Sequence, residues 1–243
     1  MAARLAARNM GLRLVQVLLV AVAAGAPAAH AWREEGHYMV CKIAEVTEHE
    51  LQSFLTIEAS AAVTSLLPGW AGGELAATCS WADDERRRYP WSGALHFADT
   101  PGDCQFFYDR DCHNTKGEKD MCVVGGINNC TAALMNSSAP LVDPTISLMF
   151  LAHFVGDIHQ PLYCGNTVDF GGNTIIVHWY NTTTTNLHRV WDLDIIEKAM
   201  KDFYNDDLSI MTQVIMQNIT EAWSEEEREW EACSSRTKTC ADK

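Results

Sequence analysis

The sequence predicts a single, mostly α-helical domain with one small β-hairpin and loops stapled by disulfides. Three observations support this fold class. Apolar residues recur at helical spacing over most of the chain. Residues 174–180 form the only convincing strand pattern, and the turn-forming stretch 181–186 after them predicts a hairpin. Nine cysteines indicate disulfides, and because nine is odd, at least one thiol is unpaired, binds a metal or pairs between chains.

The predicted helices have ordinary start and stop signals. One or two helices are expected over 37–67, where a Pro-Gly pair follows, and a shorter helix is expected over 75–88. Residues 100–131 carry four cysteines and are expected to form a stapled loop. A central helix begins at Asp143, and residues 194–230 after the hairpin are expected to be helical.

Residues 1–31 are expected to be a signal peptide. Arginines give this segment a basic start, and the apolar core that follows them is too short to span a bilayer. Small residues before Trp32 fit a cleavage site, so residues 32–243 would form one mature domain. No later apolar run is long enough for a membrane helix. We therefore expect a secreted, vacuolar or endomembrane protein.

The formal net charge of −14 argues against a basic groove that binds phosphates by charge alone. An acidic protein can still act on a polyanion if bound cations dominate the local field. Four N-x-Ser/Thr sequons predict glycosylation, which together with the cysteines suits the secretory pathway. Their asparagines are Asn129, Asn136, Asn181 and Asn218.

The predicted central helix is apolar on nearly every side, as a buried helix is. Within it, His153 and Asp157 are four residues apart and share one face. A buried charge is costly unless it is paired or binds a metal, so these side chains form either a hydrogen-bonded pair or part of a metal site. His188 and Asp192 repeat the spacing, and two such pairs in one chain favour metal binding.

Other candidate ligands lie in the first half of the chain. If cleavage frees the amine of Trp32, this amine and its carbonyl oxygen could chelate a metal beside His37, although a single histidine near a terminus is usually incidental. Asp83 lies one turn before Arg86, and the two either line a site or form a surface helix face. His96 has apolar neighbours, as core histidines also do.

Taken together, these motifs resemble the secreted trinuclear-zinc nucleases of fungi and plants, and the plant type I, or bifunctional, nucleases most of all. The resemblance covers Trp32 to about Trp223, with the motifs in the family's order. Each motif is short, but the set is highly specific. The motifs are Trp32 with Gly36-His37, Ser80-Trp81-Ala82-Asp83, Leu95-His96-Phe97, His153-Phe154-Val155-Gly156-Asp157 with Gln160-Pro161-Leu162, Gly171-Gly172-Asn173, and Asn186-Leu187-His188 with Trp191-Asp192.

The resemblance implies a mostly helical fold shared with zinc-dependent phospholipase C. It also implies hydrolysis of single-stranded DNA, RNA and 3′-nucleotides by an enzyme with three zinc ions, which we expect to be a monomer. The first zinc would be held by Asp83, His96, His153 and Asp157. The second would be held by Trp32, His37 and the bridging Asp157, and the third by His188, Asp192 and a histidine at position 163.

The same resemblance implies roles for residues around the metals. Asp83 would orient the attacking water or take its proton, and Arg86 would offset the charge that develops on the phosphate. Phe97 would stack on a base, with Asp99 and Asn173 bonding to its edge. Stacking requires an unstacked base and therefore favours single strands. The alternatives are plain packing for Phe97 and a surface ion pair for Arg86.

The chain departs from the family pattern at three places. Tyr163 stands at the position of a zinc-binding histidine, and a neutral phenol, whose pKa is about 10, is a poor zinc ligand. The neighbouring Cys164 is a candidate replacement, because a thiolate binds zinc well. Arg33 stands where the family usually has glycine, and the carboxyl end is shorter than the family's, which suggests a truncated variant.

Two other functions stay open at this point. A catalytically impaired zinc-binding relative would explain Tyr163 and the short carboxyl end. A phospholipase C-type phosphodiesterase would use the same fold on lipid head groups, although Phe97, Asp99 and Asn173 favour a nucleobase.

Overall fold

The structure is a computed structural model that describes residues 32–45, 57–102, 105–135, 143–180 and 183–223. The expected signal peptide, residues 1–31, and two of the expected glycosylation sites, Asn136 and Asn181, lie outside these ranges. Of the other two, Asn129 is exposed on a helix and Asn218 is half-buried on another, and glycosylation of both stays a prediction.

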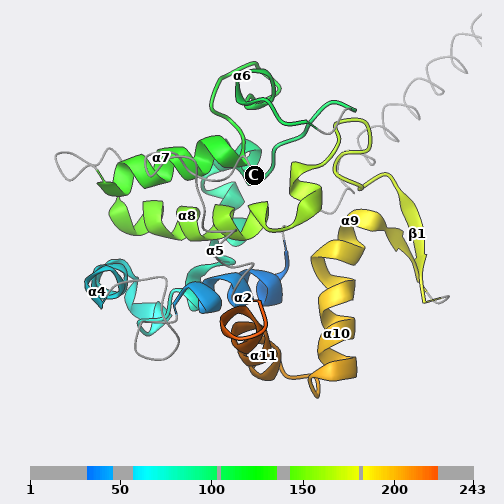
Figure 1. The fold of residues 1–243 in the computed structure, drawn as a ribbon. Coiled ribbons are helices and arrows are strands. Elements are labelled where there is room, and N and C mark those ends of the chain that lie inside the picture. The colour runs from blue at the N-terminus through cyan, green and yellow to red at the C-terminus, as the bar shows by residue number, and fades with distance from the viewer. Residues whose placement is uncertain (1–31, 46–56, 103–104, 136–142, 181–182, 224–243) are drawn as a thin grey trace, which may run out of the picture. The chain divides into compact units, whose positions relative to one another are not determined.

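The described residues are mostly helical, as the sequence predicts (Figure 1). Their α-helices are α2 (Glu34–Ala44), α4 (Ile57–Leu66), α5 (Trp81–Asp84), α6 (Tyr108–Asp111), α7 (Val123–Met135), α8 (Pro144–Ile158), α9 (Leu187–Arg189), α10 (Ile195–Phe203) and α11 (Leu208–Thr220). Their 3-10 turns are η1 (Gly69–Ala71), η2 (Ala76–Thr78), η3 (Glu85–Arg87), η4 (Pro90–His96) and η5 (Pro161–Cys164), and η6 (Val190–Asp194) is a π-turn.

The predicted hairpin is confirmed, but residues 183–186, which the sequence predicts to lie in its turn, form its second strand. Strands β1 (Ile176–Trp179) and β2 (Thr183–Asn186) pair antiparallel, with Ile176 opposite Asn186 and Trp179 opposite Thr183. This pair is the only sheet in the part of the chain that the structure describes. The hairpin leads directly into α9, and its first strand follows the glycine-rich loop at 171–172.

The central helix α8 is built as its sequence predicts. The Asp143 carboxylate accepts a hydrogen bond from the Thr145 N–H at 2.9 Å, so it caps the helix, and Pro144 occupies the first turn. Phe150 and Phe154 are fully buried, and α8 contacts α2, α5, α7 and η4. Figure 1 shows α7 lying along α8. The helix therefore stands at the centre of the core and can present side chains to several partners.

The prediction of a loop over 100–131 is wrong for the second half of this segment, because residues 123–135 form α7. Two glycines, which are poor helix formers, hid this helix in the sequence. They are needed for packing: a methyl group on Gly125 would lie 2.1 Å from the Asp120 carbonyl oxygen, and one on Gly126 would lie 3.0 Å from the Phe154 ring. The first half of the segment is stapled as predicted, by the disulfide Cys112–Cys122.

The predicted helix over 75–88 is also broken in the structure. It consists of η2, the single turn α5, and η3. A second disulfide, Cys41–Cys79, ties this segment to α2. The interruption leaves the carbonyl group of Cys79 free of helical hydrogen bonds and turned toward α8, where it contacts His153 at 2.6 Å.

The first and the last of the predicted helical segments are also helical in the structure. Helices α2 and α4 occupy most of the described parts of 37–67. Within the predicted helical stretch 194–230, α10 and α11 occupy 195–203 and 208–220 with a break between them, and residues 224–230 lie outside the described ranges. Met39, Ile196 and Met211 form a small apolar cluster that joins α2 to α10 and α11. None of the helices described is long and apolar enough to cross a membrane.

Candidate metal centre

Five of the predicted ligands meet in the interior. His37 comes from α2, Asp83 from α5, His96 from the end of η4, and His153 and Asp157 from α8. The three histidines and Asp157 are completely buried, and the Asp83 side chain is 9 % exposed. The structure therefore brings together side chains from four segments, among which only the pair on α8 is close in sequence.

Four of these side chains point their donor atoms at one spot. His96 Nδ1 lies 3.0 Å from both Asp157 Oδ2 and His153 Nε2, and His153 Nε2 lies 3.3 Å from Asp157 Oδ2. Asp83 Oδ1 is 3.9 Å from His96 Nδ1 and 3.7 Å from His153 Nε2. A tetrahedral zinc ion with bonds of about 2.0–2.1 Å separates its ligand atoms by about 3.3 Å. These distances suit one metal ion.

A second group forms on the other oxygen of Asp157. His37 Nε2 lies 3.5 Å from Asp157 Oδ1, and the His37 ring stacks on His153 with centroids 4.1 Å apart. Neither His37 Nε2 nor Asp157 Oδ1 has a hydrogen-bond partner among the described residues. Buried polar atoms without partners are rare, so a missing partner is indicated here. The free amine of Trp32, expected to complete this group, stays a prediction because residues 1–31 lie outside the description.

The backbone around the cluster is shaped to let these side chains approach. A methyl group on Gly156 would lie 2.3 Å from His37 Nδ1, so only glycine admits the imidazole to this face of α8. The Cys79 carbonyl oxygen contacts His153 Nδ1 at 2.6 Å, which leaves Nε2 facing the cluster. The disulfide Cys41–Cys79 holds α2 and the Cys79 segment together. Sequence reasoning gave neither Gly156 nor Cys79 a role.

The electrostatics favour the metal-binding protonation states. Burial alone would raise the pKa of Asp157, but His153, together with His37 and His96, holds it well below its ordinary value. Burial lowers the pKa of His153 well below its ordinary value. These directions favour an ionised carboxylate and a neutral imidazole, which are the forms that bind zinc.

Asp83 and Arg86 form an ion pair at the edge of the cluster. Arg86 Nη2 lies 2.8 Å from Asp83 Oδ1. Burial raises the pKa of Asp83, and the Arg86 guanidinium opposes that rise. The pair is not on an exposed helix face, because Asp83 faces two of the buried histidines.

His188 and Asp192 form a separate pair. His188 Nε2 lies 3.2 Å from Asp192 Oδ2, and its Nδ1 contacts the Gly171 carbonyl oxygen at 2.7 Å. Gln160 Nε2 donates a hydrogen bond to Asp192 Oδ1 at 2.6 Å. Sequence reasoning quoted Gln160 as part of a motif but gave it no role, although its place between the two ligand pairs was the available signal.

Position 163 faces this pair. The Tyr163 ring is tilted against His188, with centroids 5.0 Å apart, and only 3 % of the residue is exposed. Cys164 is exposed and is not in any group of three possible ligands within the described ranges. The idea that Cys164 replaces the missing imidazole is therefore not supported by the geometry.

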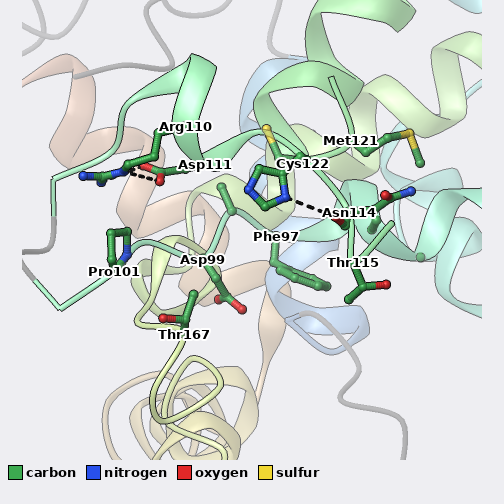
Figure 2. Close-up of a pocket in the computed structure, with 14 residues that line it drawn as sticks. Phe97, Asp99, Pro101, Arg110, Asp111, Asn114, Thr115, Met121, Cys122 and Thr167 are labelled. Atoms are coloured by element: carbon green, nitrogen blue, oxygen red, sulfur yellow. Dashed lines mark hydrogen bonds and ion pairs between the residues drawn. The ribbon is translucent and has the colours of Figure 1, made fainter. Parts of the chain in front are cut away.

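The residues expected to hold a base are partly assembled. Phe97 is 41 % exposed and, with Asp99, lines a pocket of about 580 Å³ (Figure 2). Asn114, Thr115 and Met121 also line this pocket. Burial and the charge of Asp169 raise the pKa of Asp99. Asn173 does not line this pocket; its amide instead donates to the Phe170 carbonyl oxygen at 2.9 Å.

Comparisons with known proteins agree with this geometry. A family model described as S1/P1 Nuclease matches residues 32–243. The chain is 43 % identical to Endonuclease 2 of Arabidopsis thaliana over 97 % of its own length and 80 % of the relative's. It is 45 % identical to Endonuclease 4 of the same plant, over 86 % of the chain and 70 % of the relative. With Nuclease P1 of Penicillium citrinum it shares 30 % identity over 77 % of the chain and 67 % of the relative.

The close approach at Gly156 gives a first test. In a Gly156→Ala variant the new methyl group would collide with the His37 ring and push it away from Asp157. We expect the purified variant to retain about one zinc ion fewer than the wild type, measured by elemental analysis after dialysis against buffered zinc. Gly93→Ala is the matched control, because a methyl group there meets no atom within 4 Å. Unchanged zinc content in Gly156→Ala would contradict the second group.

Proposed function

The chain belongs to the S1/P1 nuclease family, and on this premise we propose that it is a zinc-dependent endonuclease acting on single-stranded DNA and RNA. The products would be 5′-nucleotides, and 3′-nucleotides would be further substrates. Nucleic acid as the substrate class follows from the family. Zinc, the preference for single strands and the residue roles are the proposal.

The main support for zinc dependence is the buried cluster of histidines and aspartates around α8. Its donors are imidazole nitrogens and carboxylate oxygens, the set that zinc prefers, and some of these buried atoms have no partner in the described chain. Residues His37, Asp83, His96, His153 and Asp157 therefore fit two ions that share Asp157. Bound there, zinc would supply positive charge toward phosphoryl oxygens and lower the pKa of the attacking water.

The protein's own groups would orient the reaction. Asp83 lies between the cluster and Arg86, so its carboxylate can accept a hydrogen bond from the attacking water while Arg86 holds it in place. The Arg86 guanidinium is 24 % exposed and can also donate to a phosphate oxygen, offsetting the charge that develops there. Bound metal ions would make the local field positive and so allow this acidic chain to bind a polyanion.

The exposed face of Phe97 supports the preference for single strands. The Phe97 ring is partly exposed in the pocket that also contains Asp99, so an unstacked base could stack on it. Bases in a duplex are already stacked and cannot reach this face. Asp99, in the same pocket, would accept a hydrogen bond from the base edge.

The disulfides support an exported protein. Cys41–Cys79 and Cys112–Cys122 are the kind of structural bridges that form in oxidising compartments. Together with the expected signal peptide over 1–31, they support a protein that is secreted or retained in the vacuole or endomembrane system. The phospholipase C-type alternative gains no support from the relatives, which are named endonucleases and nucleases.

The role of the cluster predicts the effect of removing a ligand. His153→Ala removes one of the four donors that converge on the first metal position, so hydrolysis of single-stranded DNA should fall on the order of 10²-fold or more, since even residues behind metal ligands are worth 10–100-fold. His178→Ala serves as the control, because His178 is exposed on β1. Full activity of His153→Ala in a metal-buffered assay would refute the mechanism.

The role of Phe97 predicts a change in substrate binding. Loss of base stacking costs about 1–3 kcal/mol, so Phe97→Ala should raise KM for a short single-stranded oligonucleotide by about 5- to 150-fold. Phe203→Ala removes an equally large ring that is 77 % exposed on α10 and should leave KM unchanged. Equal KM values for the Phe97 variant and the wild type would show that the ring only packs.

A further inference from the structure

The third expected metal site lacks a third donor. His188 Nε2 and Asp192 Oδ2 converge at 3.2 Å, and their side chains are 7 % and 8 % exposed. The other oxygen of Asp192 is already taken by the Gln160 amide. Catalytic zinc sites normally use three protein ligands. Within the described residues, the groups of three possible ligands are both in the α8 cluster, and neither contains His188 or Asp192.

Tyr163 occupies the missing position without supplying a zinc donor. Its backbone is fixed on both sides, because its N–H donates to the Gln160 carbonyl at 3.0 Å and its carbonyl accepts from the Ala98 N–H at 2.7 Å. The ring is thereby held against His188. A phenol keeps its proton and binds zinc weakly, whereas imidazole, thiolate and carboxylate bind it well.

The Tyr163 hydroxyl has no hydrogen-bond partner in the described chain, although it is buried. Leaving such a group unpaired is unfavourable, so its presence indicates a partner other than the described residues. The phenol can donate its proton to a partner that accepts a hydrogen bond. A phosphate oxygen of the substrate has this chemistry and a negative charge that strengthens the bond.

From these observations we infer that this chain binds two zinc ions tightly instead of three, and that the Tyr163 hydroxyl donates a hydrogen bond to the substrate phosphate at the position expected for the third ion. The inference rests on the proposed function and deepens it. A neutral donor stabilises negative charge less than a divalent ion does, so the enzyme is active but slower than a three-zinc form.

The test is the zinc content of the full chain, dialysed against buffered zinc and measured by elemental analysis. The wild type is expected to hold about two ions, and Tyr163→His about three, with faster hydrolysis of single-stranded DNA. Three ions in the wild type, or two in a folded Tyr163→His, would overturn the inference and leave the proposed function standing. No bound zinc in the wild type would instead refute zinc dependence itself, and the inference with it.

Tyr163→Phe provides a second test that does not require a new ligand to form. The phenyl ring keeps the packing against His188 and removes only the hydroxyl. Zinc content should stay at about two ions, while kcat falls by about 10-fold, the effect of losing roughly 1.4 kcal/mol. A lower zinc content would show that the phenol is a ligand and overturn the inference, as would an unchanged kcat.

Discussion

The carboxylate of Asp157 is the constraint on which the rest of the structure depends. It is completely buried, and a buried charge must be compensated where it lies. His37, His96 and His153 reach it from α2, η4 and α8, and we propose that metal ions bound among them supply the compensating charge. The core is therefore organised around a charged centre, and α2, η4 and α5 must all pack on α8 to complete it.

The surrounding scaffold serves that centre in specific ways. Gly156 opens the face of α8 to His37, and the Cys79 carbonyl fixes the orientation of His153. The disulfide Cys41–Cys79 links α2, which carries His37, to the segment that carries this carbonyl. Phe154 lies beside His96 and packs against Gly126, which lets α7 lie close to α8. These contacts thus help to hold the ligand side chains in the arrangement that metal binding requires.

The sequence predicted what depends on local periodicity. The spacing of His153 and Asp157 identified one helical face, and the cap at Asp143 identified where the helix begins. It missed what depends on contacts between distant segments. The glycines of α7 look unfavourable for a helix until Phe154 is placed beside them, and nothing in a linear motif shows that Gln160 reaches Asp192. The family motifs predicted the ligand set, but Tyr163 could be interpreted only once its ring was seen against His188.

The central claim is that metal ions complete the charged interior, and thermal unfolding with and without a chelator tests it most directly. The wild-type chain in buffered zinc should unfold at a clearly higher temperature than after chelation, since ligand at 100 times its Kd adds about 2.7 kcal/mol. His178→Ala should lose the same amount on chelation, and His153→Ala should lose much less. Identical unfolding temperatures with and without chelator would contradict the account.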